Sequence, residues 1–166
     1  MKPVPEIVVR PEQFFAALRM QVPIPFGKYL QPAWGEVAAW LGRQALEPVG
    51  PPFIRYLTTD MARNLDIEVG FPVGTALPAD ERIATGSFPA GRYAVLVYTG
   101  SYSNQGLVKA TASLLEWANK HDIRWQTSTS QGVEWWRARY ESYMTDPQQE
   151  PDQKKWQTEI TFLISE

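Results

Sequence analysis

The segment ARYESYMTDP, residues 138–147, places a carboxylate among aromatic side chains in a stretch that otherwise has the pattern of a β-strand. Side chains alternate between the two faces of a strand, so Glu141 and Tyr143 share one face of an expected strand over 133–144. Tyr140 lies on the other face, which we expect to pack under a helix. Glu141 is then either a solvated carboxylate in a weak ion pair or a partly buried acid that meets a ligand.

A buried acid beside aromatic rings has a definite chemistry. Desolvation raises the pKa of a carboxyl group, and a bound cation favours its ionised form again. Aromatic faces attract the same cations, by about 0.5–2 kcal/mol each. Aromatic residues make up 13% of this chain, with seven each of Trp, Tyr and Phe. We therefore expect a ligand pocket around Glu141, with Glu68 as a second acidic candidate and with the aromatic side chains Tyr56, Phe71, Trp135 and Tyr143.

Several other chemistries have no support in the sequence. It contains no G-x-G-x-x-G turn, P-loop or nucleophile elbow. The single histidine, His121, permits neither a serine triad nor a multi-histidine metal site, and its place near the end of an expected helix suits the helix dipole. Zero cysteines exclude disulfides and thiolate metal sites. We expect no metal and no cofactor.

Charge and hydropathy narrow the class of protein further. The 166 residues carry a net charge of −2, without the basic stripe that binding to a phosphate backbone requires. No apolar run reaches the length of a membrane span, and the first residues lack a signal-peptide pattern. The expectation is one soluble, cytoplasmic domain over residues 1–166 that does not bind nucleic acid directly.

An internal similarity divides the chain into two copies of one unit. RPEQFFAALRMQ (10–21) aligns with FPAGRYAVLVYT (88–99). Three further matches in the same order pair Trp40 with Trp117, RYLTTD (55–60) with RYESYMTD (139–146), and EVGFPV (68–73) with EITFLI (159–164). The copies span 5–73 and 82–164, and residues 74–81 join them. Internal repeats of this kind indicate repeated structural units.

The second copy also settles whether residues 12–20 of the first copy are predicted as a helix or as a strand. EQFFAALRM (12–20) contains good helix formers, but its partner GRYAVLVYTG (91–100) is β-branched and aromatic. Both are therefore predicted strands. Each copy then has a short leading strand, a strand, a helix and two closing strands. In the first copy the leading strand is 6–10, the helix starts at about Pro32, and the closing strands are 53–59 and 64–73. In the second copy the leading strand is 82–88, the helix starts from a cap at Ser103 or Asn104, and the closing strands are 133–144 and 156–164.

Two such units predict an α+β fold in which helices cover one side of an antiparallel sheet. The alignment places Glu141 opposite Leu57, so the same position is apolar in one copy and anionic in the other. If the two modules face each other across a pseudo-twofold axis, this position lies in a groove between them.

Four stretches carry a resemblance to a known family: SFPAGRYAVLVYTGSY (87–102), LLEWANKH (114–121), RYESYMTDP (139–147) and TEITFLI (158–164). Their order resembles the gyrase-inhibitor-like (GyrI-like) small-molecule-binding family, which includes effector-binding domains of multidrug-responsive transcription regulators. The resemblance implies two strand–helix–strand–strand modules with an aromatic groove that receives lipophilic, often cationic compounds. The acid of that groove falls on Glu141. The regulators carry a separate DNA-binding domain, which we do not find in this sequence.

Three functions follow, in order of preference. The first is binding of bulky hydrophobic, cationic small molecules, for sensing or sequestration. The second, which the resemblance also implies, is hydrolysis of reactive cyclopropane-containing compounds, with Glu141 as general base and Tyr143 or Tyr56 as proton donor. The third is a protein-interaction role such as gyrase inhibition.

The charge of −2 generates a first prediction, that the purified chain does not bind DNA with sequence selectivity. Mobility-shift titrations at low and physiological salt measure this. A salt-dependent shift that discriminates between DNA sequences would contradict it.

Overall fold

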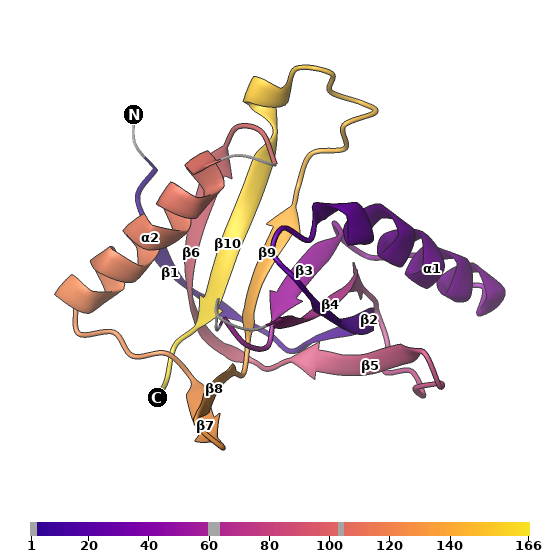
Figure 1. Ribbon diagram of the computed structural model, residues 1–166, viewed down its shortest axis with the longest axis horizontal. Coiled ribbons are helices and arrows are strands. Elements are labelled where there is room, and N and C mark those ends of the chain that lie inside the picture. Colours follow the sequence, from indigo (N-terminus) through magenta and orange to yellow (C-terminus); the bar gives the residue numbers. More distant parts are fainter. Residues whose placement is uncertain (1–2, 60–63, 103–104) are drawn as a thin grey trace.

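The computed structural model describes residues 3–59, 64–102 and 105–166, and its main element is an eight-stranded antiparallel sheet (Figure 1). Its strands are β1 (Glu6–Arg10), β2 (Gln13–Val22), β3 (Phe53–Tyr56), β4 (Leu65–Pro72), β5 (Ile83–Phe88), β6 (Gly91–Thr99), β9 (Arg139–Tyr143) and β10 (Gln157–Leu163). Two helices, α1 (Leu30–Arg43) and α2 (Gln105–Lys120), accompany it. The smaller elements are the strand pair β7 (Thr127–Ser130) and β8 (Val133–Trp136) and the 3-10 turns η1 (Gly27–Tyr29) and η2 (Gln153–Lys155). The predicted α+β class is confirmed.

The sheet has the same pattern of connections from either edge. Its order is β1-β6-β10-β9-β3-β4-β2-β5, so β6, β10 and β9 on one side correspond to β2, β4 and β3 on the other. The two edge strands are exchanged between the halves of the sequence. β1, from the first half, pairs with β6 of the second, and β5, from the second half, pairs with β2 of the first. The two inner halves meet where β3 pairs with β9. That residues 5–73 and 82–164 superpose as copies of one unit stays a prediction.

Both helices lie on the same face of the sheet. Leu107, Ala110 and Leu114 of α2 pack on Ile160 of β10, and Ala33 of α1 packs with Ile54 of β3 in a second buried cluster. Ile54 and Ile160 are both direct neighbours of Glu141 in the sheet register, and therefore share its face. Figure 1 shows β9 and β10 running between the two helices.

The opposite face of the sheet curls around a core of its own. Phe15, Phe53, Phe88, Tyr93 and Tyr140 are buried there together. Phe88 of the edge strand β5 stacks on Tyr140 of β9, with ring centroids 4.0 Å apart, although three strands separate β5 from β9 in the sheet order. Only a strongly curved sheet brings them into contact, which corrects our expectation that the Tyr140 face packs under a helix.

The expected strand 133–144 is in fact two strands. β8 ends at Trp136 and pairs with β7, whereas β9 begins at Arg139 and belongs to the main sheet. The N–H of Arg137 donates to the carbonyl of Gln126 at 3.0 Å, outside the main ladder. The break explains why Trp136 packs under α2 while Tyr140, an even number of positions later, faces the other way. The proposed helix caps Ser103 and Asn104 lie outside the described residues.

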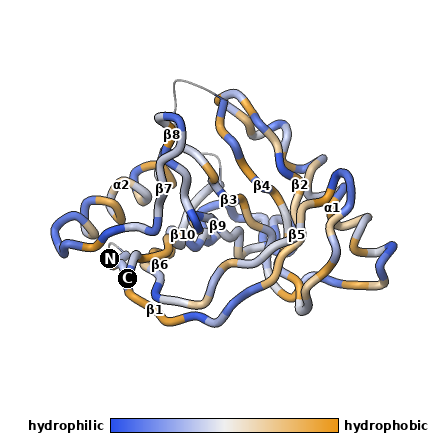
Figure 2. Tube along the Cα trace, turned by 90° about the horizontal axis from the view of Figure 1, so that it is seen from below, coloured by the Kyte–Doolittle hydropathy of each residue, from blue (hydrophilic) through white to orange (hydrophobic). Residues whose placement is uncertain are grey.

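Both helices are amphipathic, and Figure 2 shows hydrophobic and hydrophilic residues alternating along them. Two residues after the end of each helix the chain adopts a positive φ, at Ala45 after α1 and at Asp122 after α2. The next N–H in each case returns to the last turn, from Leu46 to Leu41 and from Ile123 to Ala118. Within the described residues, neither helix is long and apolar enough to cross a membrane.

Gly70 marks the closest approach of two backbones in the sheet. It lies on β4 opposite Ala17 of β2, and a Cβ atom added there would meet the carbonyl oxygen of Ala16 and the Cα of Ala17, the latter at 2.7 Å. Backbone atoms of a central strand cannot move aside as a flexible side chain can.

We predict that Gly70→Ala lowers the free energy of unfolding by about 1–3 kcal/mol, the usual cost of overpacking. The matched control is Gly35→Ala at an exposed position of α1, where an added Cβ meets nothing within 4 Å and Ala gains about 0.5–1 kcal/mol of helix propensity. Thermal melting compares the two. Equal melting temperatures for both variants would contradict the close approach of β2 and β4.

Candidate functional site

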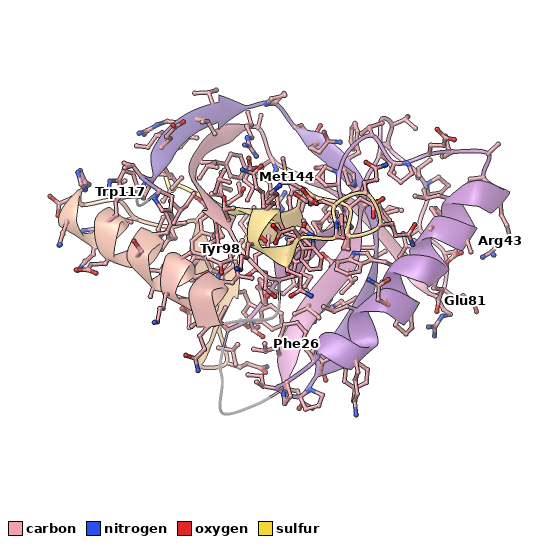
Figure 3. The ribbon with its side chains drawn as sticks, turned by 90° about the horizontal axis from the view of Figure 1, so that it is seen from above. Phe26, Arg43, Glu81, Tyr98, Trp117 and Met144 are labelled. Carbon is pink, nitrogen blue, oxygen red and sulfur yellow. The ribbon has the colours of Figure 1, made fainter. Side chains whose placement is uncertain are left out.

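Glu141 lies at the middle of β9, on the face that carries the helices. Its neighbours in the sheet are Ile54 of β3 and Ile160 of β10, which are 1% and 0% exposed. The two helices pack on either side of it, and Figure 3 shows Met144, the residue after β9, between them. The carboxylate is half-buried and has apolar side chains on both sides.

Two tyrosines donate hydrogen bonds to this carboxylate. The hydroxyl of Tyr143 donates to Oε2 at 2.6 Å, and that of Tyr56 donates to the same oxygen at 3.3 Å. Oε1 accepts no hydrogen bond from a described residue, so one oxygen of the carboxylate has its lone pairs available to a guest.

Burial controls the protonation of all three groups. Desolvation raises the pKa of the Glu141 carboxyl group, and the hydrogen bonds from Tyr143 and Tyr56 oppose this shift in part. Desolvation and the neighbouring Glu141 hold the pKa of both phenols well above the usual value of 10. The tyrosines therefore remain protonated donors at neutral pH.

Aromatic rings from three other parts of the chain surround the tyrosine pair. Trp34 of α1 meets the Tyr143 ring edge-on, with centroids 5.6 Å apart, and Tyr102 also meets it edge-on, at 5.0 Å. Phe26 lies edge-on to Tyr56 at 6.3 Å. We call these residues, together with Trp156 beside Tyr102, the aromatic cluster: Phe26, Trp34, Tyr56, Tyr102, Tyr143 and Trp156.

The polar atoms of the outer rings are occupied within the protein. Trp34 Nε1 donates to the carbonyl of Phe53 at 3.2 Å. The Tyr102 hydroxyl donates to the carbonyl of Thr145 and accepts from its N–H, at 2.6 and 2.9 Å. Trp156 Nε1 donates to the carbonyl of Glu150 at 2.7 Å. These bonds fix the rings, which then offer apolar faces rather than polar ends.

Arg139 shares the strand face of Glu141 but lies toward α2. Its guanidinium stacks on Trp136 and Phe162, 4.6 and 4.5 Å from the ring centroids. Burial lowers the pKa of this guanidinium, against the influence of Tyr56 and Glu141. It forms no ion pair within 4.0 Å with a described carboxylate, so its charge acts on Glu141 only from a distance.

The other acids of the central strands do have such partners. Asp66 is paired with Arg19 at 2.7 Å, Glu68 with Arg55 at 2.5 Å, and Glu159 with Arg10 at 2.8 Å. All three lie in the same sheet as Glu141. Among these four carboxylates, Glu141 is the one that the described residues leave without a cation in contact.

The structure brings together three of the six residues predicted for the site, Glu141, Tyr143 and Tyr56, and separates the others from them. Glu68 points to the opposite face, where Arg55 neutralises it. Phe71 packs under the other end of α1, with Val37 and Trp40. Trp135 pairs with Ser128 in the small β7–β8 sheet.

Sequence reasoning missed Trp34, Tyr102, Phe26 and Trp156. Trp34 had a usable signal, because it is one position beyond Ala33 on the buried stripe of α1. Tyr102 lies within GSY, directly after β6. Nothing local points to Phe26 or Trp156, which reach the cluster through η1 and the β9–β10 connection.

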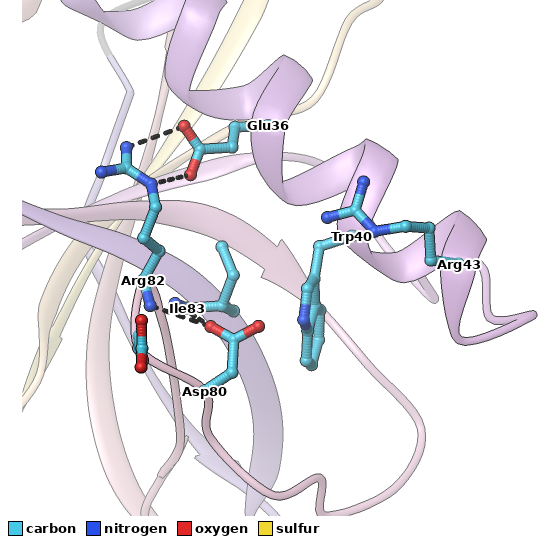
Figure 4. A pocket seen from close by; sticks show the side chains of 7 residues that line it. Glu36, Trp40, Arg43, Asp80, Arg82 and Ile83 are labelled. Atoms are coloured by element: carbon cyan, nitrogen blue, oxygen red, sulfur yellow. Dashed lines mark hydrogen bonds and ion pairs between the residues drawn. The ribbon is translucent and has the colours of Figure 1, made fainter.

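Two surface hollows lie away from this cluster. One, of about 340 Å³, is lined by Glu36, Trp40, Arg43, Asp80, Glu81, Arg82 and Ile83. Figure 4 shows that its charged groups bind one another: Arg82 holds Glu36 through two hydrogen bonds, and Asp80 accepts from the N–H groups of Arg82 and Ile83. The other, of about 580 Å³, lies beside Gly42, Ala45, Leu46 and Glu47. Within the described residues, no group of three or more acidic or histidine side chains is placed to hold a metal.

Comparison with known proteins gives a match to the family model of the GyrI-like small molecule binding domain over residues 3–165. No curated protein matches the sequence significantly. The crystal structure of the EcmrR C-terminal domain is similar with a TM-score of 0.77 at 20% identity, covering 100% of this chain and 99% of that one. In the EcmrR–DNA complex, this chain covers 59% of the EcmrR chain.

Two further solved structures share the fold. A hydrolase from Listeria innocua has a TM-score of 0.61 at 16% identity, with 99% of this chain and 93% of that chain covered. SAV2435 bound to tetraphenylphosphonium has a TM-score of 0.60 at 9% identity, with 98% and 94% covered. At these identities the likeness concerns the fold alone.

The raised pKa of Glu141 generates a prediction about pH and stability. A carboxyl group whose folded pKa exceeds its ordinary 4.5 binds its proton more tightly in the folded state. The protein therefore loses stability from this group as the pH rises from 4.5 through the folded pKa. Glu141→Gln cannot ionise, so its free energy of unfolding relative to the unmodified protein should increase across that range and then become constant.

Urea unfolding at a series of pH values from 4.5 to about 8 measures this difference. Tyr143→Phe is the companion variant: it removes the hydrogen bond that most opposes the shift, so its stability should fall more steeply with pH than that of the unmodified protein. A pH-independent difference for Glu141→Gln would show that the folded state does not raise this pKa.

Proposed function

Since the chain belongs to the family of GyrI-like small molecule binding domains, we propose that it binds bulky hydrophobic cations between its two helices, with Glu141 as the polar anchor. Sensing and sequestration both require this binding step. The function is that of a small-molecule receptor, and it needs no metal or cofactor.

One observation carries the proposal. Glu141 is the acid of the central strands that contacts no arginine among the described residues, whereas Asp66, Glu68 and Glu159 each hold one. A half-buried carboxylate without a cation is costly for the fold. A ligand with a delocalised positive charge, which loses little hydration on burial, recovers that cost when it approaches Oε1.

The aromatic cluster supports the same class of ligand. Ring faces attract cations in addition to burying apolar area, and Trp34, Tyr102 and Tyr143 lie in edge-to-face contact beside the carboxylate. The Tyr56 hydroxyl, held at 3.3 Å, makes the longer bond of the two, so it is the group we expect a guest to displace first. SAV2435, which shares the fold, was solved with tetraphenylphosphonium, a lipophilic cation.

We predict that Glu141→Gln weakens the binding of tetraphenylphosphonium by about 1–3 kcal/mol, as for the loss of a charged partner. It should leave the binding of neutral triphenylphosphine oxide nearly unchanged. Isothermal titration calorimetry measures both. The matched control is Glu159→Gln, the same substitution on the neighbouring strand but on the opposite face, which should bind both compounds as the unmodified protein does. Equal losses for the two variants, or equal losses for the two compounds, would remove Glu141 as the anchor.

A hydrolase on the same site is the second candidate. The short 2.6 Å contact between Tyr143 and Glu141 places a carboxylate base beside a phenolic acid, the pair that general acid–base hydrolysis uses. A fold neighbour is described as a hydrolase.

The same variant separates the two functions. If the chain hydrolyses a strained, cyclopropane-containing electrophile, Glu141→Gln should keep KM close to its original value and lose kcat by about 100-fold or more, as expected when a general base is removed. Progress curves with such a compound measure this. If neither the unmodified protein nor Glu141→Gln hydrolyses the compound faster than buffer alone, the catalytic role is excluded and binding remains.

A further inference from the structure

The two edges of the main sheet are not alike. Beside the edge strand β5, the connection 74–82 lies close: Thr85 donates to the carbonyl of Leu77, and Asp80 donates its N–H to the carbonyl of Ile83. The other edge strand, β1, pairs on one side with β6, and no described strand pairs with its outer side. Exposed edge strands are normally covered by another segment or carry charged side chains.

β1 presents apolar residues at this open edge. Ile7 and Val9 are 42% and 80% exposed, and Val4, just before the strand, is 73% exposed. Figure 2 shows this hydrophobic stretch at the border of the molecule. An exposed edge strand of this composition is a template for pairing with another strand.

The sheet register shows which backbone groups of β1 point outward. Arg92 of β6 accepts from the N–H of Ile164, on the side away from β1. In an antiparallel ladder the N–H and C=O of one residue point to the same side. Val9, the β1 partner of Arg92, therefore has its own N–H and C=O directed outward, and so does Ile7, two residues earlier.

Prolines limit how this edge can pair with a copy of itself. Pro5 and Pro11 occupy the next outward positions on each side and have no N–H to donate. A register that sets Ile7 against Ile7 of the second copy places Val9 against Pro5, and one that sets Val9 against Val9 places Ile7 against Pro11. In each of these two registers, one carbonyl of the strand, that of Val9 or of Ile7, faces a proline and receives no N–H. When Ile7 opposes Val9 of the other copy, the N–H and C=O groups of both residues are all paired.

Charges select the same register. With Val8 opposite Val8 on the twofold axis, Glu6 of each copy lies opposite Arg10 of the other. Opposite charges in directly facing strand positions are favourable, and like charges are not. Glu6 is exposed and has no ion-pair partner among the described residues. Arg10 already binds Glu159 through Nη1, which holds the guanidinium at this position.

We infer that the β1 edge is a docking surface for a second copy of this chain, which pairs antiparallel through residues 6–10 and joins the two sheets into one of sixteen strands. The sequence EIVVR is self-complementary in this arrangement. Since a single short strand pair buries less than a standard interface of about 1,600 Å², the dimer is weak and depends on concentration.

Sedimentation equilibrium of the full chain, from about 10 µM to 1 mM, is the first test, and it should show reversible formation of a dimer. Glu6→Lys places two cations opposite each other, and Val9→Pro removes an outward donor without touching the bonds to β6. Each should raise the dimer dissociation constant about tenfold or more, a change expected for lost hydrogen bonds and charge pairs. The control Val49→Lys changes another exposed valine, 60% exposed and in the α1–β3 connection, and should dimerise as before.

A cysteine placed in β1 tests the register itself. The chain has no cysteine, so a single one forms disulfides only between molecules. Val8→Cys brings the two Cα atoms to about 4.5 Å, within disulfide range, and diamide should link it into dimers faster than Ile7→Cys, whose partner is Val9. A chain that remains monomeric at about 1 mM, or equal linking rates for the two cysteine variants, would overturn the inference.

Discussion

Three residues of β3 pair with three of β9, and the geometry of the site depends on this short ladder. Ile54 lies opposite Glu141 because Phe53 lies opposite Ser142 and Arg55 opposite Tyr140. A shift of one residue would exchange the faces of the whole strand. Glu141 would then enter the aromatic core beneath the sheet, and Tyr140 would lie between the helices. The large rings of that core, above all Phe53, Phe88 and Tyr140, resist such a shift, so the packing of one face positions the chemistry of the other.

The distribution of arginines divides the acids into two kinds. Asp66, Glu68 and Glu159 lie on strands that also meet an arginine, and their charges are used within the fold. Glu141 meets isoleucine on both sides and phenols at its end. Hydrogen bonds from neutral donors satisfy a carboxylate without cancelling its charge, so Glu141, when ionised, gives the site a negative potential in an apolar surrounding. The fold thus holds a carboxylate without a contacting arginine on the face of the sheet that carries both helices.

Strand alternation and the internal similarity were sufficient to predict most of this architecture. The pairing of EQFFAALRM with GRYAVLVYTG identified β2 as a strand despite its helix-forming residues, because propensity yields to tertiary context. Alternation alone placed Glu141 and Tyr143 together. It failed between Trp136 and Arg139, where the chain leaves one sheet for another and the two-residue period is interrupted. The helical period of α1 places Trp34 beside its buried stripe, but the contact of Trp34 and of Tyr102 with Tyr143 joins distant segments, and a single sequence carries no periodic signal for such contacts.

The exchange of the outermost strands has a consequence for how the chain reaches its fold. β1 is made first but pairs with β6, and β5 pairs backwards with β2. As the chain emerges from the ribosome, its first strand has no partner until Gly91–Thr99 has been synthesised. Contacts between such distant segments raise the contact order and slow folding. Each half of the sequence lacks one edge strand of its own half of the sheet and receives it from the other half. We therefore expect the sheet to be completed only after both halves of the chain have been synthesised.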